Sequence, residues 1–151
     1  MIDQQRIVQI ARMTYEDIPT VHKLDQMCFS APWSLSAYYR DLRNPCACYL
    51  VARLGQEVIA FAGMWVVEDE AHVVTLAVRQ ELRRHGYGRR LLEVLLGEAR
   101  RRGAAIVTLE VRVGNLAAQQ LYLSFGFRII AFRREYYPDN NEDAAVMELK
   151  M

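Results

Sequence analysis

The segment 83–89 combines arginine, histidine and glycine in a pattern that could hold an anion. It lies between an apolar run that ends near Arg79 and a long amphipathic stretch. Its residues are Arg83, Arg84, His85, Gly86, Tyr87, Gly88 and Arg89. A strand-to-helix junction presents unpaired backbone N–H groups and the positive end of a helix dipole, and glycines let a phosphate approach the backbone closely. We therefore expect a phosphate or pyrophosphate to bind here; the alternative is a solvated, arginine-rich helix start.

The charge of the chain is distributed unevenly around this segment. Between residues 79 and 103, eight arginines stand against three glutamates, whereas the whole chain has a formal net charge of +1. A local positive field suits an anionic ligand, whereas a globally basic chain would indicate nucleic acid. The spacing lacks the Gly-Lys-Ser/Thr of nucleotidase loops and the third glycine of dinucleotide-binding folds, so neither of these sites is expected.

Hydrophobic periodicity predicts one α/β domain, 1–151, that positions this segment. The expected order is βααβββαβαββ, a mixed, mostly antiparallel sheet flanked by helices. Helices are predicted at 15–28, 35–42, 86–102 and 116–125, and strands at 7–13, 46–54, 57–67, 71–79, 104–111, 127–136 and 144–149. Ser34 is expected to cap the second helix. The near-continuous apolar run at 104–111 predicts a strand that is covered on both faces.

Length and composition fit an ordinary globular protein. The chain has 151 residues, of which 52% are hydrophobic and 25% charged, and its first residues lack the basic-then-apolar pattern of a secretory signal. No apolar run reaches the length of a membrane span, so a cytoplasmic protein is expected. Three cysteines without metal-ligand spacing predict reduced thiols and no metal site.

The motif Arg83-x-x-Gly86-x-Gly88 is similar to the pyrophosphate signature of the GCN5-related N-acetyltransferases, the GNAT superfamily, and the element order resembles that fold over nearly the whole chain. Further segments resemble the RimI-type ribosomal-protein-alanine N-acetyltransferases within it. They are Phe-Ser-Ala-Pro-Trp-Ser at 29–34, Asp-Glu-Ala-His at 69–72, Leu-Glu-Val-Arg-Val-Gly-Asn at 109–115, and Tyr-Tyr at 136–137 followed by Glu-Asp-Ala at 142–144. Gly114 departs from the pattern, since such proteins often carry serine there.

This resemblance implies that acetyl-CoA is the co-substrate and that no metal is needed. The pyrophosphate would lie on the loop 84–89. The pantetheine arm would pair with exposed backbone of Leu76, Ala77 and Val78, where two neighbouring strands splay apart, because its amides need hydrogen-bond partners. Asn115 would hydrogen-bond the cofactor further along.

The implied reaction is direct acetyl transfer to a primary amine, which needs a base for the ammonium and an acid for the leaving thiolate. Glu110, a lone carboxylate that closes an apolar run, matches the general base. Tyr122 corresponds to the tyrosine that protonates the thiolate. His72 is a competing base, acting through water, because imidazole exchanges protons near neutral pH. The alternatives are an acid at a strand end, a core tyrosine and a structural histidine.

Four aromatic residues and one proline are expected to form two walls around the acceptor. They are Phe29, Pro32 and Trp33 on one side and Tyr136 and Tyr137 on the other. An α-amine, with a pKa of about 8 against about 10.4 for lysine, suits a carboxylate base better. The resemblance implies the N-terminal alanine of a small-subunit ribosomal protein as acceptor. We also expect that no membrane or nucleic acid is required and that the protein is a monomer or weak dimer. Acetylation of a lysine or a small-molecule amine, and non-catalytic binding of acyl-CoA or RNA, remain alternatives.

Overall fold

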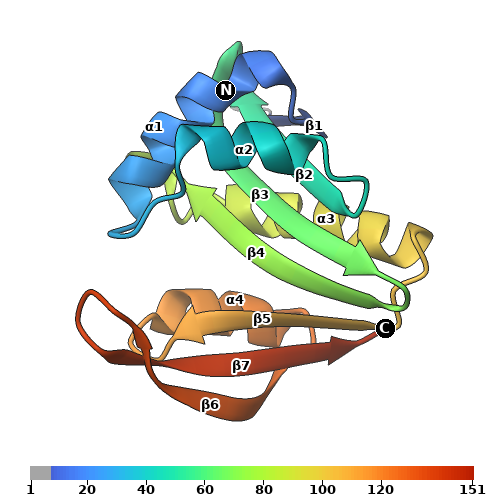
Figure 1. Cartoon of the computed structure of the whole chain (residues 1–151), viewed down its shortest axis with the longest axis vertical. Coiled ribbons are helices and arrows are strands. Elements are labelled where there is room, and N and C mark those ends of the chain that lie inside the picture. Colours follow the sequence, from blue (N-terminus) through green and yellow to red (C-terminus); the bar gives the residue numbers. More distant parts are fainter. Residues whose placement is uncertain (1–7) are drawn as a thin grey trace, which may run out of the picture.

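Within residues 8–151, which a computed structural model describes, seven strands form one sheet and four helices flank it (Figure 1). The strands are β1 (Val8–Arg12), β2 (Ala47–Leu54), β3 (Glu57–Val67), β4 (Glu70–Val78), β5 (Ile106–Arg112), β6 (Arg128–Tyr137) and β7 (Glu142–Lys150). The helices are α1 (Ile18–Cys28), α2 (Leu35–Leu42), α3 (Tyr87–Arg101) and α4 (Leu116–Ser124). Each predicted element is present within two residues of its predicted ends, except that the first helix begins as a 3-10 turn over Tyr15–Asp17 and becomes α-helical only at Ile18. Ile7 and the N-terminal segment before it lie outside the described residues. The predicted fold class is confirmed.

Strands β4 and β5 are hydrogen-bonded to each other at one end and separate at the other. The strand order is β1-β2-β3-β4-β5-β7-β6, and among the described strands only β4 and β5 run parallel. Their pairing joins 70–72 to 106–108 and ends there. Beyond this point the two strands diverge, as Figure 1 shows. The splaying that the family resemblance implies is therefore present in the sheet.

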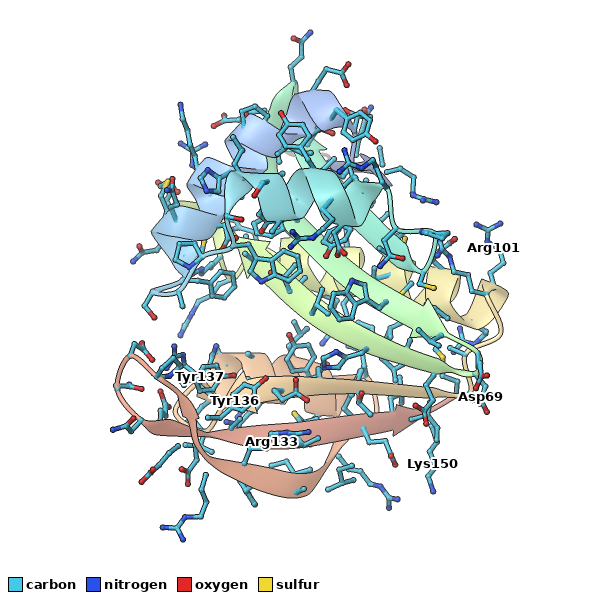
Figure 2. The ribbon with its side chains drawn as sticks, viewed as in Figure 1. Asp69, Arg101, Arg133, Tyr136, Tyr137 and Lys150 are labelled. Atoms are coloured by element: carbon cyan, nitrogen blue, oxygen red, sulfur yellow. The ribbon has the colours of Figure 1, made fainter. Side chains whose placement is uncertain are left out.

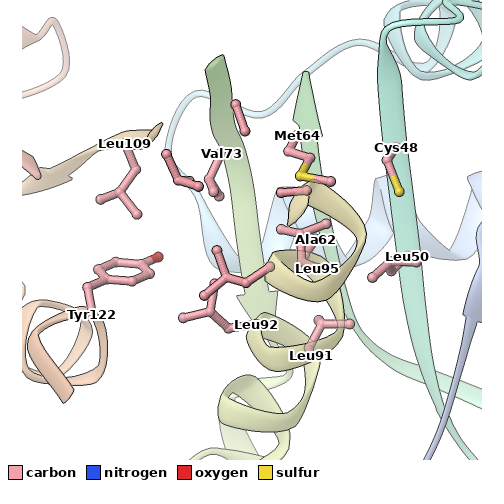
Figure 3. Packing of buried hydrophobic residues seen from close by; sticks show 14 of the residues in the cluster. Cys48, Leu50, Ala62, Met64, Val73, Leu91, Leu92, Leu95, Leu109 and Tyr122 are labelled. Atoms are coloured by element: carbon pink, nitrogen blue, oxygen red, sulfur yellow. The ribbon is translucent and has the colours of Figure 1, made fainter. Parts of the chain in front are cut away.

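Two apolar clusters hold the elements on opposite faces of the first four strands. Leu91, Leu92 and Leu95 of α3 are completely buried and pack against strand residues such as Met64 (Figure 3). On the other face, α1 buries its own apolar stripe, which includes Ile18, in a cluster with strands of the sheet. Both stripes follow the three- and four-residue spacing that places side chains on one face of a helix.

Capping residues fix where the helices begin. The Ser34 hydroxyl accepts a hydrogen bond from the Ala37 N–H at 3.2 Å, which confirms the predicted cap of α2. The Asn115 side chain does the same for α4, accepting from the Ala118 N–H at 3.1 Å. No helix within residues 8–151 is long and apolar enough to cross a membrane.

The prediction that residues 104–111 are covered on both faces is wrong. Along β5, Val107, Leu109 and Val111 are buried, while the side chains between them are only partly buried. The reason is that α1 and α2 lie over the first four strands and leave this face of β5 uncovered (Figure 1). Glu110 and Arg112 are consequently on the open face.

Candidate active site

A cavity of about 360 Å³ lies where β4 and β5 separate. Its lining joins β4, β5, α4, the end of α1 and the α1–α2 connection. From the predicted site it includes Leu76, Glu110, Asn115, Tyr122, Phe29, Trp33 and Tyr137. Residues that were predicted to bind the cofactor, to transfer protons and to bind the acceptor therefore line the same cavity. Other predicted residues, namely His72, Ala77, Val78, Pro32, Tyr136 and the loop 83–89, lie outside this lining.

Glu110 and His72 form a pair rather than two competing sites. The Nε2 atom of His72 lies 2.9 Å from Oε1 of Glu110, because β4 and β5 are still paired at His72 and Thr108. The Glu110 side chain is 15% exposed and lines the cavity, whereas the more exposed His72 stands behind it. Glu110 is therefore the member of the pair that can reach a ligand directly.

Tyr122 presents its hydroxyl group to the same cavity. The residue is buried on α4, its ring packs edge-on against Phe127 at 5.6 Å, and the hydroxyl points away from α4 beside Leu109 (Figure 3). The hydroxyl makes no hydrogen bond to any residue that the structure describes. Burial, with a contribution from Tyr137, raises the pKa of the phenol above its ordinary value. Tyr122 therefore remains protonated and able to donate.

The register of β4 decides which backbone groups face the cavity. The Arg79 N–H donates to the Ile59 carbonyl at 2.9 Å, and hydrogen-bonded pairs recur at every second residue of an antiparallel ladder. Ala77 therefore directs its polar groups toward β3. Leu76 and Val78 direct theirs toward the space beside β5, so the strand offers alternate residues rather than three successive ones.

The loop before α3 is held in place by its own side chains. Arg83 Nε donates to the Val78 carbonyl at 3.0 Å, and His85 Nδ1 donates to the Arg83 carbonyl at 2.8 Å. Tyr87 is buried in the core, and Arg89 bonds the Ser124 hydroxyl at 2.6 Å. These side chains brace the loop, so the backbone would provide most of any anion site.

Gly86 gives this loop its open shape. Its φ angle is +81°, a conformation that glycine adopts readily, and no described atom lies within 4 Å of the position of a Cβ. Because Gly86 has no side chain to cap α3, the N–H groups of the first turn, including those of Gly88 and Arg89, remain directed at the loop. A helix start of this kind can hold a phosphate group.

The interpretation of all eight arginines as one positive field is wrong in part. Arg101 and Arg102 lie beyond the middle of α3 and pair with Glu98 at 2.5 and 3.0 Å, and Figure 2 shows Arg101 far from Tyr137. A helix of 15 residues spans about 22 Å, more than twice the Debye length of about 8 Å. Only the arginines near the start of α3 can act on an anion bound there.

The two aromatic walls are present, but not all of the predicted residues belong to them. Phe29 and Trp33 line the cavity from the α1–α2 connection, and Tyr137 lines it from the end of β6. Tyr136 is exposed and stands edge-on to Tyr137 at 5.0 Å, outside the lining (Figure 2). Burial raises the pKa of Tyr137 to about 12, so this wall is neutral.

Sequence reasoning missed two charged residues of the cavity. Asp25, almost fully buried, accepts hydrogen bonds from the Tyr38 hydroxyl at 2.5 Å and from the Trp33 N–H at 3.1 Å. Burial raises the pKa of its carboxyl group despite these donors. The signal was an acid inside the apolar stripe of α1, beside Leu24. Arg112 could have been found from its place two residues after Glu110, on the same strand face.

Comparison with known proteins places this geometry in a family. The family model described as Acetyltransferase (GNAT) family matches residues 18–127. The [ribosomal protein bS18]-alanine N-acetyltransferase of Escherichia coli K12 is 40% identical over 144 residues, covering 93% of this chain and 95% of that protein. Its counterpart in Haemophilus ducreyi is 34% identical over 145 residues, covering 93% and 98%. The crystal structure of the ribosomal-protein-S18-alanine N-acetyltransferase from Escherichia coli has a TM-score of 0.88 and 35% identity, covering 95% of this chain and 94% of that one.

Proposed function

The chain belongs to the GNAT family of acetyltransferases, and from this premise we propose that it transfers an acetyl group from acetyl-CoA to the N-terminal amine of a protein. The proposed acceptor is the N-terminal alanine of a small-subunit ribosomal protein, as the names of its relatives suggest. One observation carries the proposal. Glu110, which is paired with His72, and the Tyr122 hydroxyl, which has no hydrogen-bond partner among the described residues, line one cavity beside open backbone of β4.

Acetyl-CoA fits the surfaces on either side of this cavity. Backbone groups of Leu76 and Val78 face the gap between β4 and β5, where pantetheine amides need partners, although Arg83 already occupies the Val78 carbonyl. The start of α3 at Gly86 has the open backbone and dipole that a pyrophosphate requires. Asn115 would contribute the N–H groups of its side-chain amide, because the oxygen of that amide already caps α4.

The side chains of the cavity divide the proton transfers between them. Bound acetyl-CoA supplies the thioester carbonyl that the amine attacks, so that a C–N bond forms and the C–S bond breaks. Glu110 accepts the proton of the acceptor ammonium, directly or through one water, and His72 holds the carboxylate in place. Tyr122, which burial keeps protonated at neutral pH by raising its pKa, donates a proton to the leaving thiolate. The nitrogen loses its second proton as the amide forms, and this proton restores the phenol of Tyr122, directly or through water.

An α-amine suits this site better than a lysine. The unperturbed pKa of an α-ammonium group is about 8, against about 10.4 for a lysine, so a carboxylate base can deprotonate the α-ammonium more easily. Phe29 and Tyr137 provide apolar contact area for the first residue of a peptide. We further propose that the protein acts in the cytoplasm as a monomer or weak dimer, with no metal, membrane or nucleic acid needed for the reaction.

Two peptides test the proposal directly. One begins with a free alanine, and the other is blocked at its N-terminus and contains an internal lysine. After incubation with the protein and acetyl-CoA, intact-mass spectrometry should find a gain of about 42 Da, one acetyl group, on the first peptide alone. A gain on the second alone would replace the acceptor class with lysine. A gain on neither, with acetyl-CoA still bound, would indicate a small-molecule acceptor or a binding function.

A further inference from the structure

Four side chains join the two walls of the acceptor site, and we call them the acceptor clamp: Ser30, Arg112, Asp139 and Glu142. Ser30 lies in the α1–α2 connection, Arg112 ends β5, Asp139 lies in the β6–β7 connection and Glu142 begins β7. The Ser30 hydroxyl donates to Asp139 at 2.6 Å. Arg112 donates to both Asp139 oxygens at 3.1 Å, to Glu142 at 3.2 Å and to the Ser30 hydroxyl at 3.4 Å.

We propose that the acceptor clamp is a positioning device that sets how tightly the enzyme binds its acceptor. It ties the segment that carries Phe29 to the segment that carries Tyr137, across 109 residues of sequence, and anchors both to the strand that carries Glu110. This inference rests on the proposed function for the identity of the acceptor. None of the four residues is assigned a proton transfer.

Arg112 packs against Tyr137 of the acceptor wall and shares a strand face with Glu110, the proposed base, so its orientation affects the positions of both. It lies two residues after Glu110 on the open face of β5, and its guanidinium carbon lies 3.9 Å from the centroid of the Tyr137 ring. A planar guanidinium can bond two carboxylates and stack on an aromatic ring at the same time, whereas a lysine ammonium cannot do both. Arg112 therefore fixes the distance between Tyr137 and Glu110 in a way that lysine would not.

The carboxylates of the clamp are charged at neutral pH. The hydrogen bond from Ser30, supported by Arg112, holds the pKa of Asp139 below its usual range. The Gly114 N–H, again with Arg112, lowers the pKa of Glu142. These side chains are between 21% and 32% exposed, so water and salt weaken each contact. The clamp can therefore be loosened without unfolding the core.

Gly114 makes one part of the clamp possible. Its N–H donates to Oε2 of Glu142 at 2.8 Å, and a Cβ atom at this position would lie only 2.7 Å from that oxygen. Any side chain at 114 must push the Glu142 carboxylate aside. Because the displaced atom is the flexible end of a side chain, Gly114→Ser should disturb the clamp and leave the fold intact.

The test compares Gly114→Ser with Gly97→Ser in the full chain. Gly97 is an exposed glycine of α3 with no described atom within 4 Å of a Cβ position, so it is a matched control. Steady-state kinetics on the alanine peptide should show an acceptor KM raised about two- to fivefold by Gly114→Ser, with the KM for acetyl-CoA unchanged. Gly97→Ser should change neither. Arg112→Lys should raise the acceptor KM further, by about tenfold. Lysine keeps the positive charge but lacks the planar guanidinium that bonds both carboxylates at once.

Hydrogen exchange supplies a readout that does not depend on the acceptor. Asp139→Asn should speed amide exchange in residues 29–33, and Ser30→Ala should speed it in residues 137–142. The proposal is overturned if these exchange rates do not change, or if Gly114→Ser and Arg112→Lys raise the KM of acetyl-CoA as much as that of the peptide. If the unaltered protein does not acetylate the alanine peptide, the proposed function fails, and the exchange result alone decides whether the clamp couples the two walls.

Discussion

The replacement Glu110→Gln separates the role of this residue in proton transfer from its role in structure. The side chain is 15% exposed and its Oε1 lies 2.9 Å from His72 Nε2. Glutamine has the same size and can accept the same hydrogen bond from His72, so packing and the pair geometry should persist. The change removes the ability to take a proton.

General acid–base catalysis typically contributes about 10²- to 10⁴-fold. We expect kcat to fall about 100-fold at pH 7, equivalent to about 2.7 kcal/mol in the barrier. An α-amine with a pKa of about 8 is about 10% neutral at pH 7 and about 90% neutral at pH 9. The variant can use only the fraction that is already neutral, so its deficit should shrink by up to about tenfold between these two pH values.

The assay is steady-state kinetics on the alanine peptide from pH 6.5 to 9.5, with calorimetric titration of acetyl-CoA on the same preparations. The affinity for acetyl-CoA should match that of the unaltered protein within about twofold, because Glu110 lines the cavity and the loop 83–89, the proposed pyrophosphate site, lies outside it. A deficit that is the same at every pH would refute the assignment of Glu110 as the base. A loss of acetyl-CoA affinity would show that the residue supports binding instead.

Three further substitutions test the acid, the loop and the core. Tyr122→Phe should lower kcat about 100-fold and leave the melting temperature nearly unchanged, since the hydroxyl bonds no described residue. Because burial raises the pKa of this phenol, kcat of the unaltered protein should not fall as the pH is raised from 8 to 10. Gly86→Val and Gly103→Val both place a branched side chain at positive φ, +81° and +91°, but calorimetry should find weaker acetyl-CoA binding only for the first. Leu92→Ala should reduce the free energy of unfolding by about 2 to 5 kcal/mol in urea titrations, because the side chain is fully buried.

The elements could be predicted from the sequence because each carries a local signal that agrees with its tertiary environment. The leucines of α3 recur at helical spacing and are the residues that the sheet buries. Ser34 stands immediately before the second apolar stripe and caps it. Glycine at 86 marks the start of α3 because its positive φ is needed there. In these places a short stretch of chain contains enough information to decide its own conformation.

The catalytic arrangement was only partly predictable because it depends on contacts between distant segments. Glu110 and His72 read as alternatives in the sequence, and only the short parallel pairing of β4 with β5 shows that they touch. Composition could not show that Arg101 lies at the far end of α3 from the anion loop. No local pattern predicts that Ser30 meets Asp139.

The open face of β5 explains why an apolar run misled the prediction. Such a run indicates burial on both faces when every strand of a sheet is covered alike. Here α1 and α2 stop short of the face that carries Glu110 and Arg112, the face where we propose that the acceptor binds. A strand that is apolar in sequence can therefore be half open where a site requires it.

The same incomplete sheet links the fold to its proposed chemistry. If β4 and β5 paired along their full length, the polar backbone of Leu76 would bond β5 and the cavity would close. Ending the pairing at His72 leaves that backbone free and still holds His72 against Glu110. The cost is a junction between two parts of the sheet whose ladder, among the described residues, consists of three residue pairs. The acceptor clamp spans the open end of this junction, where Arg112 bonds Asp139 and Ser30. The contacts that we propose to position the acceptor therefore also link the segments on the two sides of the opening, beyond the point where the pairing of β4 with β5 ends.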